Sequence, residues 1–292
     1  MTFLHLLVSA LVSGVLVGAF YAALASGLAL VFGVLEIPNL AHPAAVVAAA
    51  MIVHSLNGWG LDPLLAGVLL APVFFVIGAA FYSFYRFVFE IRGSPDPLRS
   101  FSLFFGLAFL IEVALIFSYG VDFQSVSAPY IGHALAFGWV RLPYRTLASF
   151  VGGTALLAGL HLFLTRTMAG GAVRAAGFDP EALRMLAISP VRIRQLAFGL
   201  SLATAAFAGA LLIVIGPVSP SADRIYIGRA FAVVVLAGMG SISGAYVAGL
   251  LLGLAETLVL TLFGASWATA VSFALVLGVL AVRPSGLFGR AR

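Results

Sequence analysis

Residues 3–35 read FLHLLVSALVSGVLVGAFYAALASGLALVFGVL and contain no Asp, Glu, Lys or Arg. About 20 apolar residues in a helix cross the hydrocarbon core of a bilayer, so this stretch is long enough to span a membrane. No basic segment precedes it and further apolar blocks follow it, so we interpret it as mature sequence and not as a signal peptide. It predicts either one tilted span or two half-spans.

The rest of the chain has the same character. Of its 292 residues, 63% are hydrophobic and 9% are charged, and the mean hydropathy is +1.17. The blocks are continuously apolar instead of alternating, which favours membrane helices over membrane strands. We therefore predict an all-α fold, a polytopic transmembrane bundle in one domain over residues 1–292, with about eight spans plus broken or re-entrant half-helices. The apolar blocks lie at 3–35, 40–61, 63–85, 100–121, 146–165, 195–222, 230–255 and 257–282.

Arginines set the predicted orientation, because cytoplasmic loops retain basic residues. They place the loops at 86–100 and 166–194 and the C-terminal tail in the cytoplasm, and they leave 122–145 outside, lying along the membrane interface. A tail inside requires an even number of crossings after the second loop, so the last three blocks cannot all be full spans. We expect the irregular element at 228–244, GRAFAVVVLAGMGSISG, as in discontinuous helices that line a cavity.

Small residues four apart allow two helices to approach closely. Three such pairs occur in the apolar blocks, and we interpret them mainly as packing sites. They are Gly14 with Gly18, Gly240 with Gly244, and Gly249 with Gly253.

Several kinds of chemistry are excluded by composition. A nucleotide-binding P-loop needs a Lys, and all fifteen basic residues of this chain are Arg. The chain has no Cys, and its five His lack metal-ligand spacing. No carboxylate pair is spaced for general acid and base catalysis. We predict no enzymatic activity, no cofactor and no metal.

A polar stretch at 174–194, RAAGFDPEALRMLAISPVRIR, interrupts this apolar chain and holds four of the fifteen Arg and two of the ten acids. Asp179 is a typical N-cap, Pro180 suits the first helical position, and Glu181 favours the helix dipole. EALRMLAI is then predicted to be a two-turn helix that ends at Ser189 and Pro190.

This short helix is predicted to lie flat on the cytoplasmic surface. Leu183, Leu186 and Ala187 would lie on one side and Arg184 on the other. One interpretation is a docking element for a soluble partner. The other is a solvated loop helix whose arginines only set the orientation.

Two acids lie deep in apolar blocks. Placing an ionisable group within a membrane span costs about 2.5–3.5 kcal/mol or more, so Glu112 and Glu256 are candidates for function. Each could line a polar path or make a structural hydrogen bond, and Glu256 could instead lie near an interface. Asp223, Arg224 and Arg229 are expected at the external mouth.

Four segments carry a resemblance to the LivH-like permease subunits of branched-chain amino acid ATP-binding-cassette (ABC) importers. The resemblance extends from about Gly18 to Gly289, and the four segments follow one another in the same order as in that family. The segments are GLALVFGVLEIPNLAHP (27–43), TRTMAGGAVRAAGFDPEALRMLAISPVRIRQLAF (165–198), FAVVVLAGMGSISGAYVAGLLLGLAE (231–256) and RPSGLFG (283–289).

The resemblance implies a multi-pass subunit of the bacterial inner membrane that moves a branched-chain or other hydrophobic amino acid. It implies a second permease chain, cytoplasmic ATP-binding subunits and a periplasmic substrate-binding protein as partners. The polar stretch would be the coupling helix that follows the motion of the ATPase. Its contacting positions would be Asp179, Glu181, Ala182, Arg184 and Ala187.

The first segment departs from the family, because Pro43 stands where a Gly is usual, after Asn39 and His42. Such drift suggests a divergent substrate, and urea and short amides are alternatives within this family. A secondary transporter driven by an ion gradient, with Glu112 and Glu256 as its ion sites, is the alternative from another class. The candidate pathway residues are Asn39, His42, Glu112, Gly238, Gly240, Ser241 and Glu256.

Overall fold

A computed structural model of the chain describes residues 3–35, 38–91, 97–137, 140–238, 240–283 and 285–289. This part is almost entirely helical, and seven of its helices are long and apolar enough to cross a membrane. The predicted fold class, a polytopic helical bundle, is confirmed. The elements are α1 (Phe3–Leu35), α2 (His42–Gly58), α3 (Pro63–Tyr85), the π-helix η1 (Arg86–Ile91), α4 (Pro97–Tyr119), β1 (Ala134–Phe137), β2 (Val140–Pro143), α5 (Tyr144–Arg166), α6 (Met168–Ala176), α7 (Pro180–Met185), α8 (Pro190–Ile215), α9 (Asp223–Ala237), α10 (Ile242–Phe263) and α11 (Ala265–Val282).

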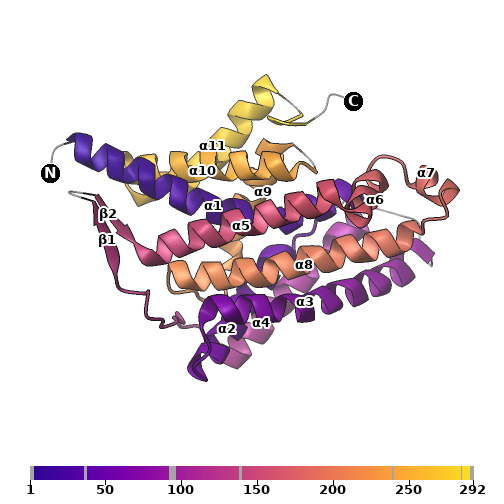
Figure 1. Cartoon of the computed structure of the whole chain (residues 1–292), viewed down its shortest axis with the longest axis horizontal. Helices are drawn as coiled ribbons and strands as arrows, with labels where there is room; N and C mark the ends of the chain where they lie inside the picture. Colours follow the sequence, from indigo (N-terminus) through magenta and orange to yellow (C-terminus); the bar gives the residue numbers. More distant parts are fainter. Residues whose placement is uncertain are drawn as a thin grey trace.

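Helices α1, α3, α5, α8 and α10 run roughly along the longest axis of the molecule, whereas α11 is inclined to it (Figure 1). The β1–β2 hairpin and the N-terminus lie at one end, and α6 and α7 lie at the other (Figure 1). The predicted orientation requires this separation of 122–145 from 166–194. The arginines predict that the α7 end faces the cytoplasm, so we call it the cytoplasmic end and call the hairpin end the external end. Parts of the other two predicted cytoplasmic segments, 92–96 and 290–292, lie outside the described residues.

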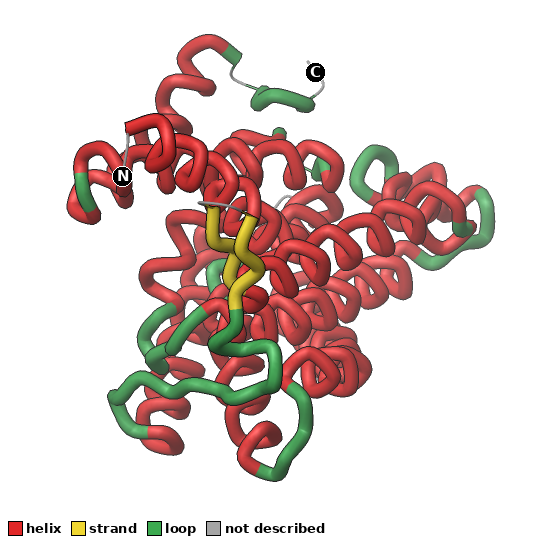
Figure 2. The backbone as a smooth tube through the Cα atoms, turned by 60° about the vertical axis from the view of Figure 1, so that its left-hand side comes forward, coloured by secondary structure: helices red, strands yellow, loops and turns green. Residues whose placement is uncertain are grey.

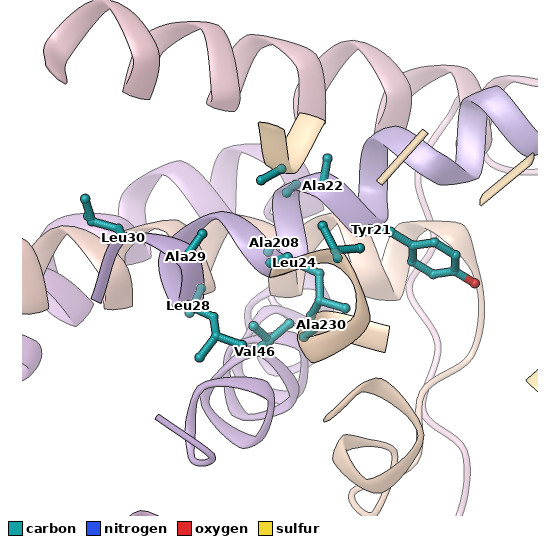
Figure 3. Packing of buried hydrophobic residues seen from close by; sticks show 14 of the residues in the cluster. Tyr21, Ala22, Leu24, Leu28, Ala29, Leu30, Val46, Ala208 and Ala230 are labelled. Atoms are coloured by element: carbon teal, nitrogen blue, oxygen red, sulfur yellow. The ribbon is translucent and has the colours of Figure 1, made fainter. Parts of the chain in front are cut away.

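Helix α1 is one continuous helix of 33 residues and forms the centre of the bundle. Its length, about 50 Å at 1.5 Å per residue, exceeds the bilayer core, so the interpretation as a single tilted span fits and two half-spans do not. Figure 3 shows Leu24 and Leu28 of α1 close to Val46 of α2, Ala208 of α8 and Ala230 of α9. Small side chains on the neighbouring helices allow this close packing around the central helix.

The predicted glycine pairs of α1 and α10 pack against each other. A Cβ built on Gly18 would lie 2.7 Å from the Leu250 Cα and 2.8 Å from the Gly249 carbonyl oxygen. One built on Gly14 would lie 2.8 Å from the Leu254 Cα. Real Cβ atoms do not approach backbone this closely, so the two helices pack at this distance because both carry glycine. The interpretation of these pairs as packing sites is confirmed.

The irregular element lies within 228–244 as predicted, but the flanking boundaries differ. Helix α9 has 15 residues, too few to cross, and ends at Gly238, and α10 begins after Ser241. Helices α10 and α11 are separated at Gly264, where φ is +91°. The predicted blocks at 230–255 and 257–282 were therefore divided wrongly, because Glu256 resembles a block end in sequence but lies inside α10.

The external end is closed by the segment between α4 and α5, which includes the small hairpin seen in yellow in Figure 2. Gln124 pairs with Val218 through two backbone hydrogen bonds of 2.9 Å, and Asn57 accepts from the Ser127 amide at 2.9 Å. Burial raises the pKa of the Tyr130 hydroxyl, and the nearby Asp62 carboxylate raises it further. These contacts hold the external loop against the helix ends.

Candidate functional site

The cytoplasmic loop is anchored to the bundle by close backbone contacts. Thr167 begins α6 by accepting a hydrogen bond from the Gly170 amide at 2.9 Å. Gly177, which follows α6, touches the Gly33 carbonyl of α1 so closely that a Cβ there would overlap it. Gly33 also packs against Gly240 in the break between α9 and α10, since a Cβ built on Gly33 would lie 2.6 Å from the Gly240 Cα. Gly33 is therefore where the loop, the end of α1 and the α9–α10 break meet.

Helix α7 begins where the sequence predicts and ends earlier. Asp179 Oδ1 accepts a hydrogen bond from the Glu181 amide at 3.0 Å. The helix ends at Met185, about one turn short of the predicted end at Ile188. Ala187 has φ +59°, and the amide of Ile188 donates to the Leu183 carbonyl at 3.0 Å. These are the features of a Schellman motif, which closes a helix C-terminus.

One side chain of α7 is buried and its neighbours are exposed. Leu183 is 2% exposed and belongs to the main hydrophobic core, whereas Met185 and Leu186 are 89% and 71% exposed. Leu186 and Ala187 therefore do not share the inner face with Leu183, as the two-turn helix had implied. Arg184 and Glu181 form an exposed ion pair of 2.9 Å. Ala182 lies in α7, but its side chain is not among those described.

Asn39 and His42 lie at the start of α2 and are buried. Asn39 Oδ1 accepts from the Ala41 amide at 3.1 Å. His42 Nε2 lies 3.1 Å from the Leu24 carbonyl oxygen of α1, and His42 Nδ1 lies 3.4 Å from the Ser201 hydroxyl of α8. His42 is 1% exposed, so in this conformation it bridges three helices and does not line an open path.

The candidates at the α9–α10 break form a compact turn. Gly238 and Gly240 have φ angles of +88° and +79°, which favour glycine. Ser241 caps α10 by accepting from the Gly244 amide at 3.0 Å. The C-terminal turn packs here, since the Leu287 amide donates to the Leu236 carbonyl at 2.8 Å. Two motifs far apart in sequence, 231–256 and 283–289, thus meet at this break.

Glu256 lies in the interior of the bundle within a closed polar network. Its Oε1 accepts from Arg229 Nε at 3.0 Å and from the Ser272 hydroxyl at 2.7 Å, and its Oε2 accepts from the Tyr21 hydroxyl at 2.5 Å. The Arg229 guanidinium lies over the rings of Tyr21 and Tyr226, 5.5 and 5.6 Å from their centroids. Arg229 therefore points inward instead of toward the external mouth.

Glu112 of α4 forms a second pair with α9. Its Oε1 lies 2.7 Å from Arg224 Nη2, and its Oε2 accepts from Arg224 Nε at 3.3 Å. Glu112 is buried, whereas 69% of the Arg224 side chain is exposed. Asp223 is 8% exposed, and its Oδ1 has no hydrogen-bond partner.

This bundle, with polar groups held between long apolar helices and a helix that protrudes at one end, is that of a multi-pass membrane protein. Residues 10–280 match the family described as the permease component of the branched-chain amino acid transport system, and the chain belongs to that family. This membership supports the ABC permease interpretation and does not favour an ion-driven secondary transporter.

Several branched-chain amino acid permeases are similar along nearly their whole length. The chain is 31% identical to the high-affinity branched-chain amino acid transport system permease protein BraD of Pseudomonas aeruginosa, over 96% of this chain and 95% of that protein. It is 31% identical to the corresponding protein LivH of Escherichia coli K12 (95% and 94% covered) and 30% identical to LivH of Salmonella typhimurium (95% and 94%). No solved structure matches the chain.

Sequence reasoning missed three features of the site. It did not identify the exposed apolar tip, Met185 and Leu186, because exposed apolar residues in a short helix resemble its buried face. It did not identify Gly33 as a meeting point, because its partners lie in two distant segments. Tyr21 gave no signal as a partner of a carboxylate, since aromatic residues are common in membrane helices.

Proposed function

We propose that the chain is one of two permease subunits of an ATP-driven importer for branched-chain or other hydrophobic amino acids. In this proposal it pairs with a second permease in the inner membrane and receives substrate from a periplasmic binding protein. Residues 176–190 couple it to a cytoplasmic ATPase subunit that hydrolyses the nucleotide. The chain itself performs no chemistry on ATP.

The observation that carries this proposal is the form of α7. The helix protrudes from the cytoplasmic end of the bundle (Figure 1), but Leu183 anchors it in the core. Because the end of α7 is exposed while Leu183 is fixed in the core, a partner that displaces α7 would also displace the helices packed against Leu183. The exposed Arg184 and Glu181 and the apolar Met185 are the groups available to an ATPase surface.

Gly33 offers a route for this motion into the membrane. Because Gly177 and Gly240 both contact it, a displacement of the loop acts directly on the α9–α10 break. Gly238, Gly240 and Ser241 would then move as a unit that opens or closes the pathway. We expect Gly33→Ala to uncouple the complex, so that ATP hydrolysis continues while uptake falls. Gly106→Ala is the control, since a Cβ there meets no atom within 4 Å.

The first test is reconstitution of the purified complex in vesicles, with uptake of radiolabelled leucine, isoleucine, urea and acetamide. We expect uptake of a hydrophobic amino acid that requires ATP, both permeases and the binding protein. Arg184→Glu should reduce uptake about tenfold or more, whereas Arg145→Glu at the external end of α5 should not. Accumulation by the chain alone without nucleotide would contradict the proposal, and uptake of urea alone would contradict the substrate.

The second test uses the absence of cysteine, because one introduced Cys then reports one position. Met185→Cys should crosslink to the ATPase subunit, and a membrane-impermeant maleimide should label it only from the cytoplasmic side. Val121→Cys, exposed in the external loop, should be labelled only from outside and form no such crosslink. Labelling of the Met185→Cys variant from outside would reverse the proposed orientation.

A further inference from the structure

The outer part of the α4–α9 face carries a charged group on an otherwise apolar membrane surface. The Arg224 side chain is 69% exposed, and Ile225 beside it is 56% exposed. Arg224 is the second residue of α9, just after the 216–222 segment, which is tied to the external loop through Val218. A guanidinium facing lipid is costly, so this face meets water or a partner chain instead of acyl chains.

Arg224 contacts Glu112 with one edge of its guanidinium, and the N–H donors of its other edge do not contact Glu112. The contacts to Glu112 use Nε and Nη2, at 3.3 and 2.7 Å. A guanidinium has five N–H groups in a planar fork, and the two on Nη1 contact neither Glu112 oxygen, so they remain for a further acceptor. A second carboxylate is the acceptor that fits such a fork best, because it can accept two parallel hydrogen bonds.

Asp223, in contrast, has an acceptor oxygen that lacks a donor. Its side chain is more than nine-tenths buried, and its Oδ1 lacks a partner. It lies close enough to Glu112 and Arg224 to interact with both charges. Asp223 and Glu112 are both acids beside Arg224, but only Glu112 is paired with its guanidinium. A buried carboxylate oxygen without a partner is costly, and a cationic donor would satisfy it.

We propose that Asp223, Glu112 and Arg224 form a receiving site for the zwitterionic head of an α-amino acid, with the ammonium at Asp223 Oδ1 and the carboxylate on the free edge of Arg224. This site rests on the proposed import function and adds to it the part of the substrate that the permease itself recognises. It selects the amino acid head and leaves discrimination of side chains to other groups.

A metal ion fits this cluster less well. Within the described residues no group of three or more His, Cys, Asp or Glu is arranged to hold a metal, and the cluster has only two acids. A cation alone would also leave the free edge of Arg224 without an acceptor. A molecule that carries both charges satisfies both groups at once, and an α-amino acid is the smallest such molecule in the proposed substrate class.

The test measures leucine binding to the purified complex in nanodiscs without the binding protein. Competitors are 4-methylpentanoate, which lacks the ammonium, and isoamylamine, which lacks the carboxylate. We expect leucine to bind at millimolar concentrations and both analogues to compete at least tenfold more weakly. Asp223→Asn should weaken leucine binding and raise the KM for uptake about tenfold or more. Asp122→Asn, a change of an exposed acid in the external loop, is the matched control.

The inference is overturned if either analogue competes as well as leucine, or if Asp223→Asn binds leucine like the wild type. It is also overturned if the wild-type complex transports leucine but binds none at millimolar concentrations. The analogue comparison uses the wild-type chain, so it stands even if the variant does not fold. Failure of the wild-type complex to import any amino acid with ATP would instead contradict the proposed function.

Discussion

Two arginines of α9 each bind a glutamate from another membrane helix, and the two pairs differ in how completely they are enclosed. Arg229 and Glu256 lie inside the bundle, where Tyr21 and Ser272 occupy the remaining positions on the carboxylate. Arg224 covers Glu112 from the surface and keeps its outer edge exposed. The comparison separates a pair whose carboxylate is enclosed by three donors inside the bundle from a pair that still has unused N–H donors at the surface.

Breaking the enclosed pair should have the largest effect on stability. Arg229→Ala leaves the Glu256 carboxylate buried without its cation, which costs about 3–5 kcal/mol. We expect little folded protein or a strongly lowered thermal midpoint in detergent, measured by a fluorescence-detected unfolding assay. Arg145→Ala, at the exposed external end of α5, is the control. An unfolding midpoint close to the wild type would mean that the enclosed network contributes little.

The glycine contact beside the enclosed pair should be the next most sensitive. Gly18→Val places side-chain atoms where the α10 backbone lies, and overpacking of this kind costs about 1–3 kcal/mol. The same assay should show a lower midpoint for this variant. Gly106→Val on α4 should be nearly neutral, since a Cβ there meets open space. Equal effects at the two positions would contradict the close contact of α1 with α10.

Removing the Ser272 hydroxyl, a neutral donor to Glu256, should lower stability less than removing Arg229. Ser272→Ala deletes the hydrogen bond to Glu256 Oε1 but keeps Arg229 and Tyr21 in place, so we expect a loss of about 1 kcal/mol in the free energy of unfolding. Chemical denaturation of the purified protein measures it. Ser118→Ala is the control, because that hydroxyl donates only to the Ala114 carbonyl of its own helix.

Changing the open pair, Glu112 and Arg224, should affect transport more than stability. Of the four variants, we expect it to change the free energy of unfolding least. Glu112→Gln keeps an acceptor for Arg224, whose exposed head can be solvated, so the free energy of unfolding should change by about 1 kcal/mol or less. Uptake should show a KM raised about tenfold, because the ammonium loses an attracting charge. If Glu112→Gln destabilises the protein as much as Arg229→Ala, the two pairs do not differ as proposed.

Local signals in the sequence predicted the elements that depend on local chemistry. The start of α7 follows from Asp179, Pro180 and Glu181, whose side chains act within one turn. Its end could not be predicted, because Ala187 adopts φ +59°, a conformation that a residue other than glycine rarely adopts. The contact of Leu183 with the core helps to fix this ending.

The placement of Glu256 shows the same limit within the membrane. In sequence it divides an apolar run and suggested a block boundary, whereas the true break lies at Gly264. A charge can remain inside a helix when a partner lies opposite, and Arg229 is on another helix. Which pairs form is therefore not visible in the order of residues.

Hydropathy and the distribution of Arg were enough to predict that this chain lies in a membrane as a helical bundle, with one polar stretch on the arginine-rich side. These are sums over local properties and do not depend on which helix meets which. Only the tertiary structure decided that Glu256 is enclosed, that Glu112 is paired at an open surface, and that Gly33 joins the loop to the α9–α10 break. Such features depend on distances between groups far apart in the chain, and packing of the helices sets those distances.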